Sequence, residues 1–269
     1  MSDCEAGQSP WAALHGLRIG CVQYLNAEPL IHCYDREVVF DHPSALAREL
    51  TAGRLDAALV PVFEVLRDPV YDLVDGVAVA SDGPVHSVVL AYRGELRDVR
   101  SVSLDPASLT SAHLLQVLLA EFHGLHPAYG AGGEARLLIG NQAIEFRAAT
   151  HDPELHWLDL GEEWRARTEL PFVFAAWALR PGLDHPRQIG DAFRELKNRG
   201  QQQLATIVGN PANGTTPGAL SDPAFRNRYL SEHIRYELGL REKEGLARYR
   251  SLLAKWLLVA SEKPPLRFV

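Results

Sequence analysis

Segments with the pattern of buried strands alternate with helical segments along the first two thirds of the chain. Apolar runs predict strands at 17–23, 38–42 and 55–62, and residues 43–54 have the pattern of a helix. That helix has a proline in its first turn and a glycine near its end, and Leu46 and Leu50 share one face. Strands that alternate with helices favour a parallel sheet that helices cover.

The same pattern starts again after a polar break, GELRDVR, at 94–100. Two more strands are expected just before this break, at 76–81 and 87–93. Beyond it we expect helices at 110–124 and 141–148, and strands at 101–105, 135–140, 156–160 and 171–179. The sequence therefore predicts two α/β blocks, one after the other.

From about His185 the patterns are helical only. Helices are expected at 188–208, 223–238 and 241–260, the last with its apolar residues at the three-and-four spacing of one face. These helices need a sheet to cover, and the first block has too few helices for its strands. The chain is therefore expected to return to the first block.

The predicted architecture is an α/β fold of two lobes, each a mixed sheet flanked by helices. Lobe I comprises residues 17–93 and 182–269, and lobe II, residues 94–181, is inserted into it. The chain would cross between the lobes near Arg93 and again near 180–182. Ligands of α/β folds bind outside the carboxyl ends of strands, and clefts between lobes are favoured sites. The interlobe cleft is thus the expected ligand site.

Composition narrows the classes of function. The chain has 269 residues, 46% of them hydrophobic, which suits a globular protein with a real core and argues against disorder. Its net charge is −7 and it has no block rich in lysine or arginine, so nucleic acid is a poor partner. Its longest apolar runs fall short of the ~20 residues that span a membrane.

The cysteines and the N-terminal residues predict a cytoplasmic protein. Cys4, Cys21 and Cys33 are odd in number and lack the C-x-x-C spacing of zinc and redox sites, so reduced thiols are expected. The first 16 residues lack the basic start and apolar core of a signal peptide. The sequence leaves open whether the chain forms a homodimer.

Four polar corners follow expected strands. They are the segment Tyr24, Leu25 and Asn26; the segment SDGPVHS from Ser81 to Ser87; the segment SLTS at 108–111; and the segment GNQA at 140–143. Hydroxyls and amides at several strand ends suit a shared polar site better than four separate turns.

The third corner has the clearest chemistry. Thr110 and Ser111 stand where a helix begins, and free N–H groups with the positive end of the helix dipole would hold a carboxylate or phosphate there. The alternative is that Ser108 or Thr110 only caps the helix, since serine and threonine are favoured caps. Asn141 has the same two interpretations, as a cap or as a ligand donor.

The second corner can be a plain hairpin with solvated hydroxyls, because Asp-Gly-Pro marks a tight bend. His86 has no carboxylate at a recognisable spacing and is more typical of a surface or core histidine than of a base. The chain lacks a G-x-S-x-G elbow, a P-loop and an H-E-x-x-H zinc motif, so neither a cofactor nor a metal is expected. These signals alone predict a two-lobed binder of a small anion.

Seven motifs occur in an order that resembles one family. They are RIGCVQYLNAEPL, PSALARELTAGRLDAALVPVFE, VASDGPVHSVVL, SLDPASLTSAHLLQVLL, RLLIGNQAI, LDLGEEW and TELPFVFAAWALRPG. Together they resemble the chorismate dehydratases of the futalosine route to menaquinone, from about Leu17 to the last helix. The resemblance implies a type II periplasmic-binding-protein fold used as a cytoplasmic enzyme.

The resemblance also implies the reaction. Water would be removed from chorismate to give 3-[(1-carboxyvinyl)oxy]benzoate, with the substrate's own enolpyruvyl carboxylate as base. Asn26 would orient the substrate near the leaving hydroxyl or the developing charge, and Ser87 would assist departure of the hydroxyl or bind a carboxylate. Thr110 and Ser111 would hold a carboxylate at the helix start, with Ser108 nearby. The polar corners add Tyr24, Ser81 and Asn141 to the predicted substrate-binding residues.

Two other functions stay open on the sequence. A non-catalytic solute-binding protein for a small anion has the same lobed fold. The sister lyase, dihydroxynaphthoate synthase, opens with a Ser-Pro-Cys-Pro-Asn-Asp-type motif, and this chain has YLNAEPL in its place.

Overall fold

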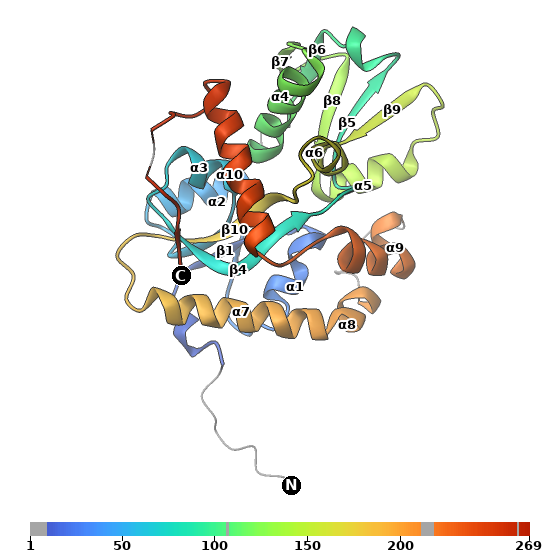
Figure 1. Ribbon diagram of the computed structural model, residues 1–269. Coiled ribbons are helices and arrows are strands. Elements are labelled where there is room, and N and C mark those ends of the chain that lie inside the picture. Colours follow the sequence, from blue (N-terminus) through green and yellow to red (C-terminus); the bar gives the residue numbers. More distant parts are fainter. Residues whose placement is uncertain (1–9, 106–107, 211–217, 263) are drawn as a thin grey trace.

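The computed structural model describes residues 10–105, 108–210, 218–262 and 264–269, and it contains two mixed sheets (Figure 1). In the first sheet, β1 lies parallel to β2 and β3, and β10 runs antiparallel between β3 and β4. The strand order is β11 (Arg267–Phe268), β4 (Asp72–Ser81), β10 (Phe172–Leu179), β3 (Ala57–Pro61), β1 (Ile19–Cys21), β2 (Val39–Phe40).

The second sheet is built around an antiparallel strand, β5. This strand pairs with β8 on one side and β9 on the other, whereas β6 is parallel to both β7 and β8. The strand order is β7 (Ala128–Gly130), β6 (Ser101–Ser103), β8 (Ala135–Ile139), β5 (Val88–Arg93), β9 (Leu155–Asp159). Two mixed sheets confirm the predicted fold class.

Helices flank both sheets (Figure 1). The second sheet carries α4 (Leu109–His123), α5 (Gly140–Ala149) and α6 (Leu160–Thr168), and short 3-10 turns are η1 (Ala12–Leu14), η2 (Leu25–Ala27), η3 (Leu96–Asp98) and η4 (Ala219–Ser221). The other helices are α1 (Glu28–Ile31), α2 (Pro43–Thr51), α3 (Val62–Arg67), α7 (Pro186–Gln202), α8 (Leu204–Gly209), α9 (Pro223–Arg228), the π-helical turn η5 (Tyr229–His233) and α10 (Leu240–Lys255). Because α10 packs on both β10 and α4, it bridges the two halves.

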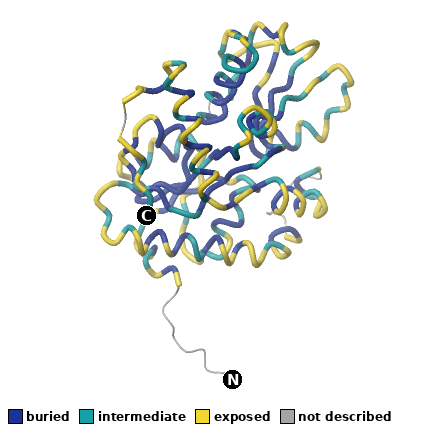
Figure 2. The backbone as a smooth tube through the Cα atoms, viewed as in Figure 1, coloured by how far each residue is buried: buried dark blue, intermediate teal, exposed yellow. Residues whose placement is uncertain are grey.

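The core fills the space between sheets and helices (Figure 2). The long helix α7 begins at a proline and buries one apolar face against β4, and the Trp177 ring of β10 stacks on Phe193 of α7 at 4.3 Å. Just before β3 begins, Asp56 accepts hydrogen bonds from Arg18 and Arg180. These bonds, those of Arg18 first, hold the pKa of Asp56 far below its ordinary value. Asp56 thus ties β1, β3 and β10 together at the end of the sheet that lies away from the site described below.

Two strands belong to the opposite sheet from the one predicted from the sequence. We expected 87–93 in lobe I and 171–179 in lobe II, but β5 pairs with β8 and β9, and β10 pairs with β3 and β4. The chain therefore passes between the sheets at 82–87 and at 169–171, before the expected positions near Arg93 and 180–182. Apart from Arg93 at the end of β5, both strands consist of apolar and aromatic residues, so their composition does not distinguish one core from the other.

The C-terminal segment contains more than three helices. The expected helix at 188–208 is broken at Gln203 into α7 and α8, and the one at 223–238 ends early. After η5 the backbone extends, because Arg235 exchanges hydrogen bonds with Ala80 of β4. The last helix ends at Lys255 instead of 260, and the chain then closes the first sheet as β11. The sequence also did not predict α3 or β7.

One glycine lets α7 pack directly on α1. A Cβ built on Gly200 would lie 1.8 Å from the backbone oxygen of Pro29. We therefore expect Gly200→Ala to lower the free energy of unfolding by about 1–3 kcal/mol, the usual effect of overpacking. Urea denaturation measures it. The matched control is Gly209→Ala, since a Cβ on Gly209 meets no atom within 4 Å; equal losses in the two variants would contradict this packing.

Candidate functional site

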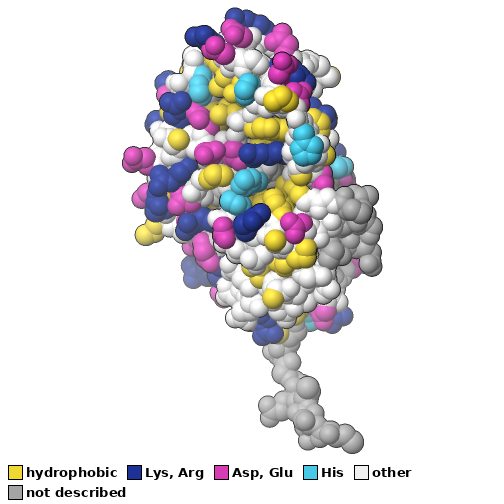
Figure 3. All heavy atoms as spheres, turned by 90° about the vertical axis from the view of Figure 1, so that its right-hand side faces the viewer, with side chains coloured by type: hydrophobic (Ala, Val, Ile, Leu, Met, Phe, Trp, Pro, Cys, Tyr) yellow, Lys and Arg dark blue, Asp and Glu magenta, His cyan; other side chains and the backbone are white. Residues whose placement is uncertain are grey.

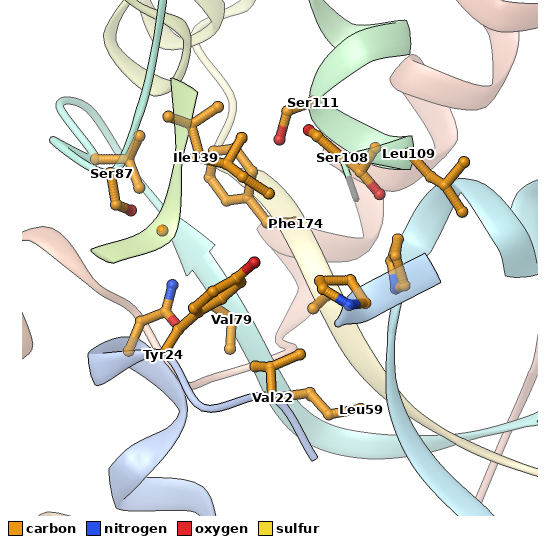
Figure 4. Close-up of a pocket in the computed structure, with 18 residues that line it drawn as sticks. Val22, Tyr24, Leu59, Val79, Ser87, Ser108, Leu109, Ser111, Ile139 and Phe174 are labelled. Carbon is orange, nitrogen blue, oxygen red and sulfur yellow. The ribbon is translucent and has the colours of Figure 1, made fainter. Parts of the chain in front are cut away.

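A cavity of about 70 Å³ lies between the two sheets (Figure 4). Strand ends and helix starts from both halves supply its walls. The lining residues are Val22, Tyr24, Asn26, Pro43, Leu59, Pro61, Val79, Val85, Ser87, Val88, Ser108, Leu109, Thr110, Ser111, Ile139, Gly140, Phe174 and Ala175. Six of the eight residues predicted from the sequence are among them.

Three helices begin at the cavity wall. Pro43 is the first residue of α2, Leu109 is the first of α4, and Gly140 is the first of α5. The first N–H groups of a helix lack partners within the helix, and its dipole places positive charge at that end. The described residues that line the cavity carry no charged side chain, so the helix starts supply its positive potential. An anionic ligand suits such a site.

The start of α4 brings three hydroxyls to the cavity. Ser108 occupies the N-cap position, but its side chain makes no capping bond, and its buried hydroxyl has no partner among the described residues. Thr110 accepts a hydrogen bond from the Phe63 N–H at 3.1 Å, which fixes its oxygen between α4 and α3. The Ser111 hydroxyl points into the cavity (Figure 4). Capping therefore does not account for Ser108, which is free to donate to a ligand.

The first corner meets the second half of the molecule. The Asn141 side chain accepts a hydrogen bond from the Leu25 N–H at 3.0 Å and donates to the Gln23 oxygen at 3.4 Å. Next to it, Gly140 has φ +59°, and a Cβ there would lie 2.9 Å from the Tyr24 ring. Only glycine tolerates both this conformation and this approach. The Tyr24 ring consequently reaches across the cavity (Figure 4).

Burial raises the pKa of Tyr24 to about 12, and the nearby charge of Asp105 acts in the same direction. The phenol is therefore neutral across the physiological range and keeps its proton to donate. Asn26, two residues on in η2, adds an amide that can both donate and accept. Their neighbour Asn141 holds the corner in place without lining the cavity itself.

Ser87 is positioned by a buried carboxylate, Asp159. The Asp159 oxygens accept from the N–H groups of Val85 and His86 at 2.7–3.1 Å, and from those of Gly161 and Glu162 at the start of α6. This arrangement fixes the loop that precedes Ser87, whose side chain is fully buried and directed toward the cavity (Figure 4). The sequence motif LDLGEEW contained Asp159, but its spacing from Ser87 did not reveal the contact.

Ser81 lies outside the cavity lining. A Cβ built on Gly161 would come within 2.5 Å of the Ser81 hydroxyl, which shows how closely that residue packs against α6. His86 has φ +61° and forms an edge contact with His233, 4.1 Å between ring centres. Burial is the main cause that lowers the pKa of His86, and His233 lowers it further. The charge of Asp159 acts in the opposite direction.

Tyr229 is a site neighbour that sequence reasoning missed. It lies in a segment expected to be plain helix, is 1% exposed, and belongs to the turn that packs against η2. Burial raises the pKa of Tyr229 above its ordinary range, and the Ser87 and Asn26 side chains oppose that rise. The Ser87 hydroxyl has no hydrogen-bond partner among the described residues.

Within 10–105, 108–210, 218–262 and 264–269, no three His, Cys, Asp or Glu side chains are grouped to hold a metal ion. Over the same ranges, every helix is too short or too polar to cross a membrane. On the face in Figure 3, acidic and basic side chains are interspersed.

Comparison with known sequences identifies relatives over most of the chain. A family model described as menaquinone biosynthesis matches residues 17–255. A chorismate dehydratase from Thermus thermophilus is 32% identical, over 80% of this chain and 89% of the relative. A chorismate dehydratase from Campylobacter jejuni is 26% identical, over 84% of this chain and 88% of the relative.

Solved structures share the fold. A protein of Archaeoglobus fulgidus aligns with a TM-score of 0.70 at 16% identity, covering 90% of this chain and 98% of its own. The alkanesulfonate-binding protein SsuA from Xanthomonas axonopodis, solved with MOPS, aligns with a TM-score of 0.57 at 16% identity, covering 93% and 95%. At these identities the likeness concerns the fold alone, and it confirms the expected periplasmic-binding-protein-like architecture.

The Asp159 carboxylate should contribute to stability beyond an ordinary helix cap. Because Asp159→Asn removes the charge that four backbone donors share, we expect a loss of about 1.5–3 kcal/mol in the free energy of unfolding. Urea denaturation checks this. Asp222→Asn is the control, since Asp222 caps α9 at the surface with one bond to Ala224. A loss no greater than that of the control would contradict the linking role of Asp159.

Proposed function

The chain belongs to the menaquinone biosynthesis family, and we infer that it is a chorismate dehydratase. The observation that carries this inference is the match to a chorismate dehydratase at 32% identity over 80% of the chain. The cavity supports it independently, because its helix starts, hydroxyls and amide suit a small dianion such as chorismate. The reaction is the elimination of water from chorismate to give 3-[(1-carboxyvinyl)oxy]benzoate.

The elimination removes the C4 hydroxyl and the C3 proton of the ring. Electrons of the broken C3–H bond form the new ring double bond, the C–O bond to the C4 hydroxyl breaks, and the ring becomes aromatic. Aromatisation supplies the driving force, so the protein has to position the substrate, assist the leaving group and exclude water.

We propose that the start of α4 holds one substrate carboxylate. Ser108, Thr110 and Ser111 line the cavity there, and Thr110 is already fixed by the Phe63 N–H. The unpaired Ser108 hydroxyl can donate to the carboxylate without breaking an existing bond. The helix dipole adds to the attraction.

We propose that the second carboxylate, on the enolpyruvyl group, takes the C3 proton. The described residues that line the cavity offer hydroxyls, one phenol and one amide, which are donors and weak acceptors at neutral pH. The substrate's carboxylate is the stronger base in such surroundings. A base carried by the substrate is also correctly placed once the ring is bound.

Asn26 and Ser87, which both line the cavity, are proposed to act at the leaving hydroxyl. Ser87 lies across the cavity from the start of α4 (Figure 4). Both are neutral and both can donate a hydrogen bond to the departing oxygen. Neutral donors stabilise the charge that develops there without drawing the ring carboxylate away from α4. We assign Tyr24 to contact with the substrate ring or ether, and Asn141 to holding the Tyr24 corner.

We further propose that the enzyme acts in the cytoplasm. Cys21 and Cys33, the cysteines that the structure describes, are free thiols. Thiols of biosynthetic enzymes stay reduced in that compartment.

The activity itself is the first test. Purified protein incubated with chorismate should yield 3-[(1-carboxyvinyl)oxy]benzoate and one water per turnover, since the cavity should bind and align this dianion. Proton NMR follows the loss of the C3 proton signal and the movement of the C4 proton signal into the aromatic region, where the other ring signals of the product also appear. If the enzyme converts no more chorismate than a boiled-enzyme control does, the proposed function is refuted.

The two proposed catalytic side chains can be tested separately from folding. Asn26→Asp keeps the size but puts a negative charge beside a dianion, and Ser87→Ala removes a donor. Each should lower kcat/KM by more than about tenfold with little change in the melting temperature. Steady-state assays with thermal melting measure both. Normal turnover by Asn26→Asp would contradict the catalytic role of Asn26 and leave it as a residue that only forms the turn.

A further inference from the structure

Tyr249 of α10 reaches the start of α4 from inside the core. Its side chain is fully buried, and its hydroxyl donates a hydrogen bond to the Thr110 backbone oxygen at 3.1 Å. This oxygen also belongs to the hydrogen-bond ladder of α4, and a carbonyl oxygen can accept two bonds. The phenol therefore adds a second bond at the helix turn where the proposed carboxylate site lies.

The direction of the Tyr249 hydroxyl is fixed by its surroundings. The Tyr249 ring makes edge contacts with Phe172 of β10 and Trp164 of α6, at 4.9 and 5.9 Å between ring centres. One turn earlier in α10, a Cβ built on Gly245 would overlap the Pro171 backbone oxygen, so the helix lies directly against the second crossing between the sheets. A ring packed in this way has little freedom to turn.

Two polar groups of Thr110 are held by helices other than its own. Its backbone oxygen accepts from Tyr249 of α10, and its hydroxyl oxygen accepts from the Phe63 N–H of α3 at 3.1 Å. A hydroxyl that accepts one hydrogen bond keeps its own proton to donate. Thr110 lines the cavity, so that proton can be offered to a carboxylate bound there.

We propose that Tyr249 is a positioning residue for the ring carboxylate of the substrate, acting through Thr110. Together with the Phe63 N–H, it holds Thr110 in one conformation before the substrate arrives. Binding then does not have to order this side chain, a step that would otherwise reduce the affinity. Tyr249 does not line the cavity, so it does not contact the substrate itself. The inference rests on the proposed function.

The first test removes the Tyr249 hydroxyl alone. Tyr249→Phe keeps the ring and its packing, and the Thr110 oxygen keeps its bond within α4. We expect KM for chorismate to rise about three- to tenfold with kcat within about twofold of the wild type, because the lost binding is shared by the ground state and the transition state. The affinity for 3-[(1-carboxyvinyl)oxy]benzoate, measured by calorimetry, should fall by the same factor. A KM and an affinity equal to those of the wild type would overturn the proposal.

Tyr236→Phe is the matched control. Tyr236 is also buried, and its hydroxyl has no hydrogen-bond partner among the described residues. Removing that hydroxyl should leave KM and the affinity for the product within about twofold of the wild type. An equal loss of affinity in both variants would assign the effect to general repacking and would overturn the proposal. Thermal melting shows that each variant is folded.

A double variant tests whether Tyr249 acts through Thr110. Thr110→Val removes the hydroxyl and keeps the shape of the side chain and the backbone oxygen. In this background, Tyr249→Phe should change the affinity for the product less than about twofold, because no hydroxyl remains to be positioned. Equal factors in both backgrounds would overturn the link to Thr110. An inactive wild type refutes the proposed function and this inference together, whereas an active wild type with an unaffected Tyr249→Phe variant refutes the inference alone.

Discussion

The carboxylate of Asp159 connects the two halves of the molecule at the point where the site forms. It accepts hydrogen bonds from the first crossing, at Val85 and His86, and from the first turn of α6, after which the chain crosses back. A buried carboxylate without such donors would be very costly, so the two segments stay together. Ser87 follows Val85 and His86 directly, so the contact that joins the lobes also determines the position of Ser87.

The cavity suits an anion although none of its described lining residues is cationic and the chain has a net charge of −7. Helix starts at Pro43, Leu109 and Gly140 take that role, because parallel strands of both sheets end toward the same space. Fixed backbone dipoles need no counterion and no reorganisation when the ring charge shifts. The same property suits the roles proposed for the neutral groups of Asn26 and Ser87.

Most elements could be predicted from the sequence, and six of the eight residues predicted for the site line the cavity, since apolar runs and polar corners are local signals. Strand partners are not local: β5 and β10 are mostly apolar and suit either sheet, so the crossings were expected too late. Tyr229 was missed because the helix pattern continues past it, whereas the residues after its turn pair with β4, a strand far away in the sequence. Ser81 follows the polar pattern but packs against Gly161.

The contact of Asn141 with the backbone at Gln23 and Leu25 joins the lobes at the rim of the cavity through neutral groups only. Salt screens charge pairs at a surface but has little effect on amide hydrogen bonds. Ionic strength should therefore act on the arrival of the dianion, through the association rate, and leave the seal between the lobes at this rim unaltered. Capture of the substrate would thus depend on long-range electrostatic attraction, and its enclosure at this rim on hydrogen bonds between neutral groups.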